Sequence, residues 1–125
     1  MHKSRLAVAV IDCQEGDLGE YGAFWANALG RVAEDRPKDP RYIDLQGPDT
    51  ELRVLLQSVD HSPRVHLDIE TDDIPAEVDR LKRLGATEVG KCKAWVVMEA
   101  PSGHRFCVVD PQRPDFEENA NVWDD

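Results

Sequence analysis

The stretch RVHLDIETDDIPAEVDRLKRLGA, residues 64–86, decides the fold of this chain. Its first part alternates polar and apolar side chains, and this period of two predicts a strand over residues 64–70. Three polar side chains, His66, Asp68 and Glu70, then lie on one face of the strand. The other face is apolar and consists of Val65, Leu67 and Ile69, of which Leu67 and Ile69 are predicted to face the following helix.

The second part of the stretch has the pattern of an amphipathic helix over about residues 72–86. Asp72 or Asp73 is expected to cap its N-terminus, Pro75 suits its first turn, and Gly85 ends it. An apolar stripe at helical spacing is expected to face the sheet. The stripe consists of Ile74, Val78, Leu81 and Leu84.

The same order of elements is predicted earlier in the chain. LAVAVIDC (6–13) is typical of a buried strand, and GDLGEYGAFWANALG (16–30) of a helix with Asp17 as N-cap and Gly30 as its end. The apolar stripe of this helix is predicted to be Leu18, Tyr21, Trp25 and Ala28, widened by Phe24. Three strands are expected after each helix, near 31–36, 41–47 and 51–59, and then at 88–92, 94–100 and 104–110. The repeated order indicates an internal duplication.

Composition narrows the class of protein. The 125 residues are the size of one domain, and 41% hydrophobic residues suffice for one modest core. A net charge of −10 argues against binding nucleic acid, whose phosphates would repel an acidic surface. The three cysteines form no C-x-x-C pair, which suits a reducing cytoplasm. The apolar run over residues 6–11 is too short for a signal peptide or a membrane span, so no membrane association is expected.

Three segments carry a family resemblance: FWANALG (24–30), HLDIETDDIPAEVDRLKRLGA (66–86) and WVVMEAPSGHRFCVVDP (95–111). With the paired strand order, they resemble the glyoxalase-like domain of the vicinal oxygen chelate superfamily, which includes glyoxalase I, bleomycin-resistance proteins and extradiol dioxygenases. The resemblance spans about residues 5–112. It implies an α+β fold in which two βαβββ modules, about 5–60 and 63–112, form curved, mostly antiparallel sheets around a ligand cleft. Within this division, residues 1–112 are the glyoxalase-like domain and residues 113–125 are an acidic tail.

The resemblance also indicates where a metal would bind, since the metal-dependent members take ligands from the first and last strands of each module. His66 resembles the metal-binding histidine of the family, whereas Cys107 stands where a glutamate usually falls. Gln57 is the nearest inward candidate in the fourth strand, and residues 6–9 of the first strand offer no ligand. One imidazole, one amide and one thiol fall short of the donors that a divalent metal prefers. We therefore expect no cofactor, with a divalent metal on His66 as the alternative.

Each candidate side chain also has a plain structural interpretation. His66 is either a hydrogen-bonded, partly buried histidine, a ligand contact or a metal ligand. Trp95 either stacks on a planar ligand or packs in a core or dimer interface, while Val96 and Met98 face the core in either case. Arg53 shares a face with Gln57 and either clamps a carboxylate or phosphate or is a solvated edge charge. Cys107 becomes a nucleophile only if an imidazole lies within reach; His61 and His104 lie in predicted turns and are assigned no role.

These observations favour a small-molecule-binding glyoxalase-like protein that works without a metal. Its cleft is expected to be lined by Gln57, His66, Trp95, Cys107 and Arg53. The alternative is a metal-dependent lyase, isomerase or dioxygenase that uses His66 as metal ligand or general base. A cytoplasmic homodimer is expected, and the tail is predicted to dock Phe116 and Trp123 on the body or on a partner subunit.

Overall fold

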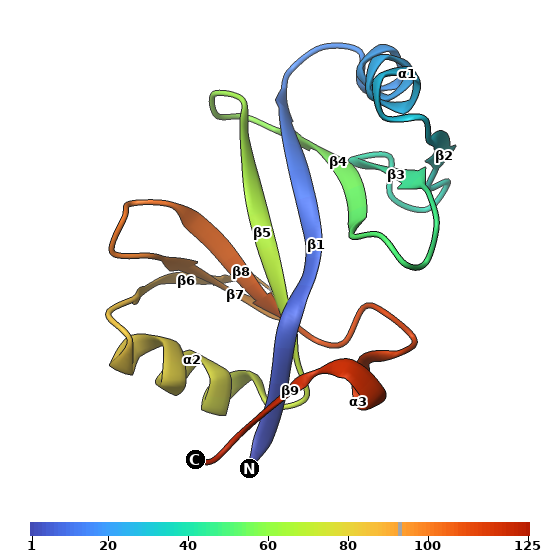
Figure 1. The fold of residues 1–125 in the computed structure, drawn as a ribbon. Helices are drawn as coiled ribbons and strands as arrows, with labels where there is room; N and C mark the ends of the chain where they lie inside the picture. Colours follow the sequence, from blue (N-terminus) through green and yellow to red (C-terminus); the bar gives the residue numbers. More distant parts are fainter. Residues whose placement is uncertain (93) are drawn as a thin grey trace. The chain divides into compact units, whose positions relative to one another are not determined.

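The computed structural model describes residues 1–92 and 94–125 and has an α+β fold (Figure 1). The predicted order of a strand, a helix and three strands occurs twice along the chain and is followed by a short helix and a short strand. The described residues divide into two compact units. We call Val8–His66 the N-terminal unit, and Met1–Ala7 together with Leu67–Asp125 the C-terminal unit. No helix in the described part of the chain is long and apolar enough to cross a membrane.

The N-terminal unit is a sheet with one helix on one face (Figure 1). Strand β1 (His2–Gln14) runs parallel to β4 (Arg53–Val59) through its second half. Strand β3 (Tyr42–Gln46) pairs antiparallel with both β4 and β2 (Val32–Asp35). Helix α1 (Leu18–Leu29) packs on the apolar face of this sheet, and the buried core there consists of Cys13, Ala26, Ile43, Leu45 and Leu56.

Helix α1 begins and ends where the sequence predicts, but it is rotated from the predicted stripe. The Asp17 side chain accepts a hydrogen bond from the Glu20 backbone N–H, and Gly30 adopts the left-handed conformation at φ 68°. The centre of the buried face is Gly22 and Ala26, so the prediction that Phe24 and Ala28 belong to that face was wrong; both are exposed. Small residues at the centre allow α1 to approach the sheet closely, with Leu18, Tyr21 and Trp25 packing around them.

The C-terminal unit has the corresponding arrangement, with α2 (Ile74–Arg83) against one face of its sheet (Figure 1). Strand β5 (Arg64–Thr71) pairs parallel with β8 (Arg105–Val109), and β7 (Trp95–Glu99) pairs antiparallel with both β8 and β6 (Thr87–Cys92). The core under α2 consists of Val78, Leu81, Ala86, Val96, Met98 and Val108, which confirms the predicted core positions of Val96 and Met98.

The apolar pattern around α2 is only partly confirmed. The Asp73 side chain caps the helix by accepting from the Ala76 N–H, and Pro75 lies in the first turn. Leu84, predicted to belong to the buried stripe, is 66% exposed because the helix ends at Arg83. On β5, Ile69 packs against the core, whereas Val65 and Leu67 are exposed, because α2 lies over β6, β7 and β8 rather than over β5.

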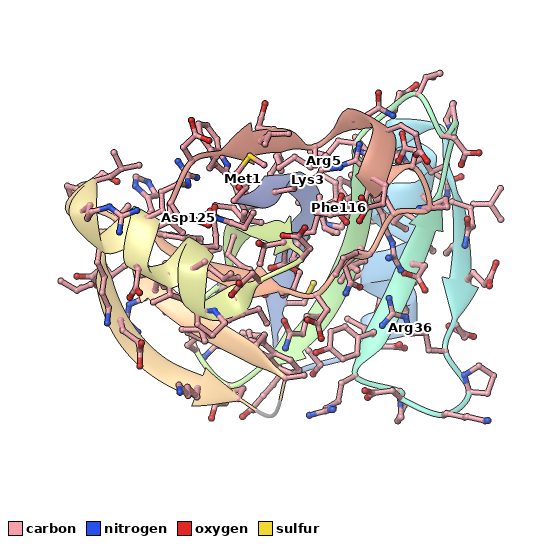
Figure 2. The ribbon with its side chains drawn as sticks, turned by 90° about the horizontal axis from the view of Figure 1, so that it is seen from below. Met1, Lys3, Arg5, Arg36, Phe116 and Asp125 are labelled. Atoms are coloured by element: carbon pink, nitrogen blue, oxygen red, sulfur yellow. The ribbon has the colours of Figure 1, made fainter. Side chains whose placement is uncertain are left out.

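The C-terminal tail docks on the body of its own chain, as one of the two predicted alternatives requires. Helix α3 (Phe116–Asn119) buries Phe116, and β9 (Asn121–Trp123) pairs antiparallel with the first residues of β1. The Trp123 indole N–H donates to the Ser4 hydroxyl at 2.8 Å, and the Arg5 guanidinium lies 6.0 Å from the centre of the Phe116 ring (Figure 2). The homodimer remains a prediction.

A buried charge cluster joins the start of β1, helix α2 and the end of the tail. Both side chains of the His2–Glu77 pair are fully buried, and the His2 Nε2 atom lies 2.7 Å from a carboxylate oxygen of Glu77. The His2 Nδ1 atom is 2.5 Å from the carboxylate of Asp125. Arg80 donates two hydrogen bonds to Glu77, each 2.8 Å long, and stacks over the Trp123 ring at 3.9 Å. These contacts connect the tail to α2 through charge as well as through apolar burial.

Candidate functional site

The face of the N-terminal sheet that points away from α1 carries the candidate site. Because Ile11, Leu56 and Ile43 pack toward α1, their neighbours along each strand point to the opposite face. The strand register places these neighbours in two adjacent rows that run across β1, β4 and β3. One row is Asp12, Gln57 and Tyr42, and the next is Val10, Leu55 and Asp44. Polar and charged groups therefore lie on either side of Val10 and Leu55, which are themselves buried.

Asp12 and His66 form a buried pair on this face. The Asp12 side chain is 1% exposed, and its Oδ2 atom lies 2.8 Å from Nδ1 of His66. Since a carboxylate accepts, Nδ1 carries the proton, and a neutral His66 then has its lone pair on Nε2. His61 Nε2 and Arg64 Nε lie 3.8 and 3.7 Å from the same oxygen. The second oxygen, Oδ1, is buried and has no hydrogen-bond partner among the described residues.

Asp12 is the site residue that the sequence argument missed. Residues 6–9 of the first strand, where the family resemblance indicates a ligand, contain no polar side chain, and Asp12 lies beyond them. The alternation Val8, Val10, Asp12 was visible in the sequence, and a carboxylate at the end of an apolar strand is an unusual buried group. What the pattern alone did not contain was the parallel pairing that sets Asp12 opposite Gln57.

A second charged cluster lies on the same face. Arg36, which follows β2 (Figure 2), donates from Nε and Nη2 to the two oxygens of Asp44, each at 2.8 Å. Arg53 donates from Nη2 to Asp44 Oδ1 at 3.1 Å. The hydrogen bonds from Arg36, with a further bond from Arg53, hold the pKa of Asp44 below its usual value despite partial burial. The Arg36 guanidinium also lies 5.0 Å from the centre of the Tyr42 ring.

The structure brings three of the five predicted ligand-contacting residues to this face of the N-terminal unit. Arg53 and Gln57 share the face, as their spacing predicts, and Gln57 is the register partner of Asp12. His66 reaches the face through its hydrogen bond with Asp12. Arg53 is held by an ion pair with Asp44, so the solvated edge charge considered as its alternative is not what the structure shows.

The other two predicted residues, Trp95 and Cys107, belong to the C-terminal unit. Trp95 and Val97 alternate along β7 with Val96 and Met98, which point into the core, and Cys107 is the register partner of Val97. Trp95 and Cys107 therefore lie on the sheet face opposite α2. Cys107 is half-buried and pairs with Val97 on β7 and with Asp68 on β5. A ligand contact for Trp95 or Cys107 remains a prediction.

Glu70 was predicted to share a polar face with His66 and Asp68, but its role is structural. Its side chain is fully buried, and Oε2 accepts from Arg5 Nε at 2.6 Å. Its Oε1 accepts from the backbone N–H groups of Gln112 and Arg113, at 2.6 and 3.0 Å. Glu70 therefore anchors the segment that follows β8, in a position that sequence alternation alone does not reveal.

Comparisons with known proteins agree with the fold. The sequence profile of the Glyoxalase-like domain matches residues 8–109. The fold resembles methylmalonyl-CoA epimerase from Mycobacterium tuberculosis, at 16% identity and a TM-score of 0.60, with 91% of each chain covered. It also resembles a glyoxalase/bleomycin resistance protein/dioxygenase superfamily member from Vibrio splendidus 12B01, at 18% identity and a TM-score of 0.51, covering 84% of this chain and 98% of that one. A comparison with curated protein sequences finds no significant match.

This chain is therefore a member of the Glyoxalase-like domain family. The predicted resemblance and the α+β fold are confirmed. At these levels of identity the structural likeness concerns the fold, and any function has to be argued from the residues of this chain.

Proposed function

We propose that this protein binds a small organic molecule without a metal, on the face of the N-terminal sheet that holds Gln57, His66 and Arg53. The observation that carries the proposal is the Asp12–His66 pair. A buried carboxylate with one oxygen lacking a hydrogen-bond partner among the described residues is costly for a fold that needs only stability. The buried carboxylates of Glu70 and Glu77, which have structural roles, accept hydrogen bonds at both oxygens, whereas Asp12 does not, and such a buried titratable group is a candidate for a functional site.

The surroundings of the pair support binding of an organic ligand. Val10 and Leu55, beside Asp12 and Gln57 in the register, are buried, so the polar groups of this face rather than these two side chains would contact a ligand. Asp12 fixes the tautomer of His66, which leaves Nε2 as the acceptor nitrogen in the neutral ring. The amide of Gln57 offers both a donor and an acceptor on the same face.

Thermal stabilisation by a panel of small aromatic and carbonyl compounds tests this proposal. We expect at least one compound to raise the melting temperature of the wild-type protein, and Asp12→Asn and Gln57→Ala to reduce that shift. His104→Gln, in an exposed turn of the C-terminal unit, is the matched control and should respond like the wild type. Absence of any stabilising compound, or equal shifts in all variants, contradicts the proposal.

Trp95 and Cys107 remain proposed ligand contacts on the sheet of the C-terminal unit. Their half-buried position on the face away from α2 supports this, because the core itself does not need them. Trp95→Ala and Cys107→Ser should each weaken the shift given by the same compound. An unchanged shift in a variant removes that residue from the proposed site.

A second candidate, a metal-dependent lyase, isomerase or dioxygenase, has one observation in its favour. A carboxylate that accepts from Nδ1 of a histidine orients the ring for metal binding through Nε2, and Asp12 does this for His66. Asp68 lies two residues further along the same strand, and Cys107 is its register partner on β8. His66, Asp68 and Cys107 would supply a nitrogen, an oxygen and a sulfur donor, a set suited to Zn²⁺. A bound Zn²⁺ would polarise a carbonyl oxygen of the substrate.

Metal content separates the two candidates. Protein purified without a chelator is assayed for Zn, Fe, Ni and Mn, and the assay is repeated on His66→Ala and on the His104→Gln control. Stoichiometric metal that is lost in His66→Ala alone favours the enzyme. The absence of stoichiometric metal in the wild type, together with stabilisation by an organic compound, favours the metal-independent binder.

A further inference from the structure

We propose that the outer face of helix α1 docks against the same face of a second copy of this chain, as a two-fold symmetric dimer. The outer face of α1 is the set of exposed side chains that point away from the sheet: Glu20, Ala23, Phe24, Asn27 and Ala28. Phe116 and Trp123, one predicted means of holding a partner subunit, dock on their own chain in the structure. A dimer therefore needs another surface.

The composition of this face differs from that of a solvated helix. Among the seven exposed residues of α1, Glu20 alone is charged, although 32% of the whole chain is charged. Helix α2 stands at the corresponding place in the second half of the chain, and its exposed residues are Pro75, Asp79, Lys82 and Arg83. Because the corresponding helix presents charges to water, contact with water does not account for the outer face of α1.

Phe24 projects from the middle of the outer face of α1. Its side chain is 63% exposed, and it is the one aromatic residue among the exposed large hydrophobic residues of the described chain. The ring packs edge to face with Trp25, with the ring centres 5.2 Å apart and the planes at 87°. This contact orients the Phe24 ring without burying it. An exposed but oriented aromatic ring is typical of an interface anchor, because it loses little side-chain freedom on binding.

The outer face of α1 combines a projection with the room to receive one, which favours a second copy as the occupant. Ala23 and Ala28 flank Phe24 and allow another helix to approach closely. In a two-fold symmetric contact the same patch faces itself. With antiparallel α1 helices and the axis at the level of Ala26, Phe24 lies opposite Ala28 of the partner subunit. The two Asn27 side chains are then offset by only about 3 Å along the helices.

Asn27 is the polar residue closest to this axis. Its side chain forms no hydrogen bond with the described part of the chain. A carboxamide both donates and accepts, so two amides related by a two-fold axis complement each other. A single asparagine at a helix interface can specify the partner and the register in this way. Asn27 therefore favours an identical helix over an unrelated apolar surface.

Electrostatics limits where two copies of this chain can meet. Each copy has a net charge of −10, and like charges brought together at an interface oppose association. The outer face of α1 has one carboxylate, Glu20, and the antiparallel arrangement sets it about 18 Å along the helices from its counterpart. Other charges near the helix lie outside this face or pair within the chain: Glu15, Asp17, Arg31, Glu34 and Asp35. Two copies can therefore meet here with little repulsion across the contact itself.

The size of the contact sets the expected affinity. Helix α1 has 12 residues and is about 18 Å long, so one helix pair buries less than the roughly 800 Å² per partner of a standard interface. We therefore expect a weak dimer with a dissociation constant of roughly 10–100 μM. Because salt screens the overall repulsion between two acidic copies, the dimer should tighten from about 0.05 to about 0.5 M NaCl.

Sedimentation equilibrium over about 5–500 μM protein measures this association. Phe24→Glu removes the anchor, and Asn27→Asp sets two carboxylates against each other near the axis, so each should weaken dimerisation at least about tenfold. Leu84→Glu is the matched control, because it adds the same charge at a leucine that is 66% exposed at the end of α2. Its dissociation constant should equal that of the wild type. Circular dichroism confirms that each variant is folded.

Each outcome decides the question. A wild-type protein that stays monomeric at about 500 μM overturns the inference, and the outer face of α1 then serves another kind of partner. Dimers that persist unchanged in Phe24→Glu or in Asn27→Asp overturn it as well, because the contact then lies elsewhere. Equal weakening in Leu84→Glu traces the effect to total charge, and the assignment to α1 is then wrong. The proposed ligand site lies on the opposite face of the sheet, so its own test stands apart from these results.

Discussion

Replacing Glu77 by glutamine should destabilise the fold more than any substitution of an exposed charge. Glu77 is fully buried and accepts from Arg80 twice, at 2.8 Å, and from His2 once, at 2.7 Å. A neutral amide cannot satisfy both cations, so two partly or fully buried positive charges lose their counter-charge. Breaking a buried pair by removing one partner typically costs about 3–5 kcal/mol. Since Arg80 is 19% exposed and regains some solvation, we expect about 3 kcal/mol for Glu77→Gln.

Urea denaturation followed by circular dichroism measures this loss. The midpoint should fall while the slope of the free energy with urea stays constant, because the surface exposed on unfolding hardly changes. At roughly 4 °C per kcal/mol for a domain of this size, the melting temperature should fall by about 12 °C. Glu88→Gln, which removes an exposed carboxylate 3.6 Å from Lys82, is the control and should change the stability by less than about 0.5 kcal/mol. A loss for Glu77→Gln below about 1 kcal/mol would refute the reasoning.

The same cluster makes a signed prediction for pH. Burial opposes the charged form of His2, but its bonds to Glu77 and Asp125 outweigh burial and raise the pKa of the imidazole. This stabilisation is complete below the unfolded pKa, about 6.5, and is lost as the pH rises through the folded value. Burial of Glu77 is likewise outweighed by Arg80 and His2, which lower the pKa of its carboxyl. That stabilisation is complete above about pH 4.3 and is lost as the pH falls through the folded value.

The difference in unfolding free energy between the wild type and Glu77→Gln should therefore be largest between about pH 4.5 and 6.5. Both nitrogens of His2 face carboxylates in the structure, which requires the doubly protonated ring. Urea titrations at pH 4, 5.5 and 8 measure the difference directly. A difference that keeps growing toward pH 8 would contradict the assigned role of His2.

Two further predictions concern packing. Deleting residues 113–125 removes the buried ring of Phe116 and the Trp123 hydrogen bond, so we expect the free energy of unfolding in urea to fall by at least about 3 kcal/mol. An unchanged midpoint would contradict the docking of the tail. A changed elution volume would show that the tail also supports the predicted homodimer. Gly22→Ala should destabilise the N-terminal unit by about 1 kcal/mol in spite of the better helix propensity of alanine, because the new Cβ would lie 3.1 Å from Cδ1 of Ile43. Equal or greater stability of that variant would show that Ile43 can move aside.

Much of the fold follows from local patterns that the sequence displays. The strand predicted over residues 64–70, the Asp17 cap, the Asp73 cap (one of two predicted alternatives) and the helix end at Gly30 appear in the structure where they are predicted. These features depend on backbone geometry and on nearest neighbours along the chain, which is the information that a single sequence contains. The burial predicted for Phe24, Ala28 and Leu84 failed because it depends on how far a helix rotates and where it ends on its sheet, and the helix contact predicted for Leu67 failed because it depends on which strands α2 covers.

The candidate site was predictable only in part, for a related reason. Alternation along one strand assigned Arg53 and Gln57 to one face, because that relation stays within the strand. The Asp12–His66 pair joins residues 54 positions apart, and the Arg36–Asp44–Arg53 cluster joins three segments. The choice of partner in each case depends on strand register between segments, and a shift of one residue would turn each side chain to the other face.

By itself the sequence determined the family, the order of the elements, the helix caps and the side chains that share a strand face, since each is set by local spacing. The tertiary structure alone decided which charges meet. It buried Glu70 and Glu77 as structural anchors, paired Asp12 with His66, and set two arginines against one carboxylate. Charge pairing is a contact between distant segments, and its energy depends on distance and burial that no local pattern contains.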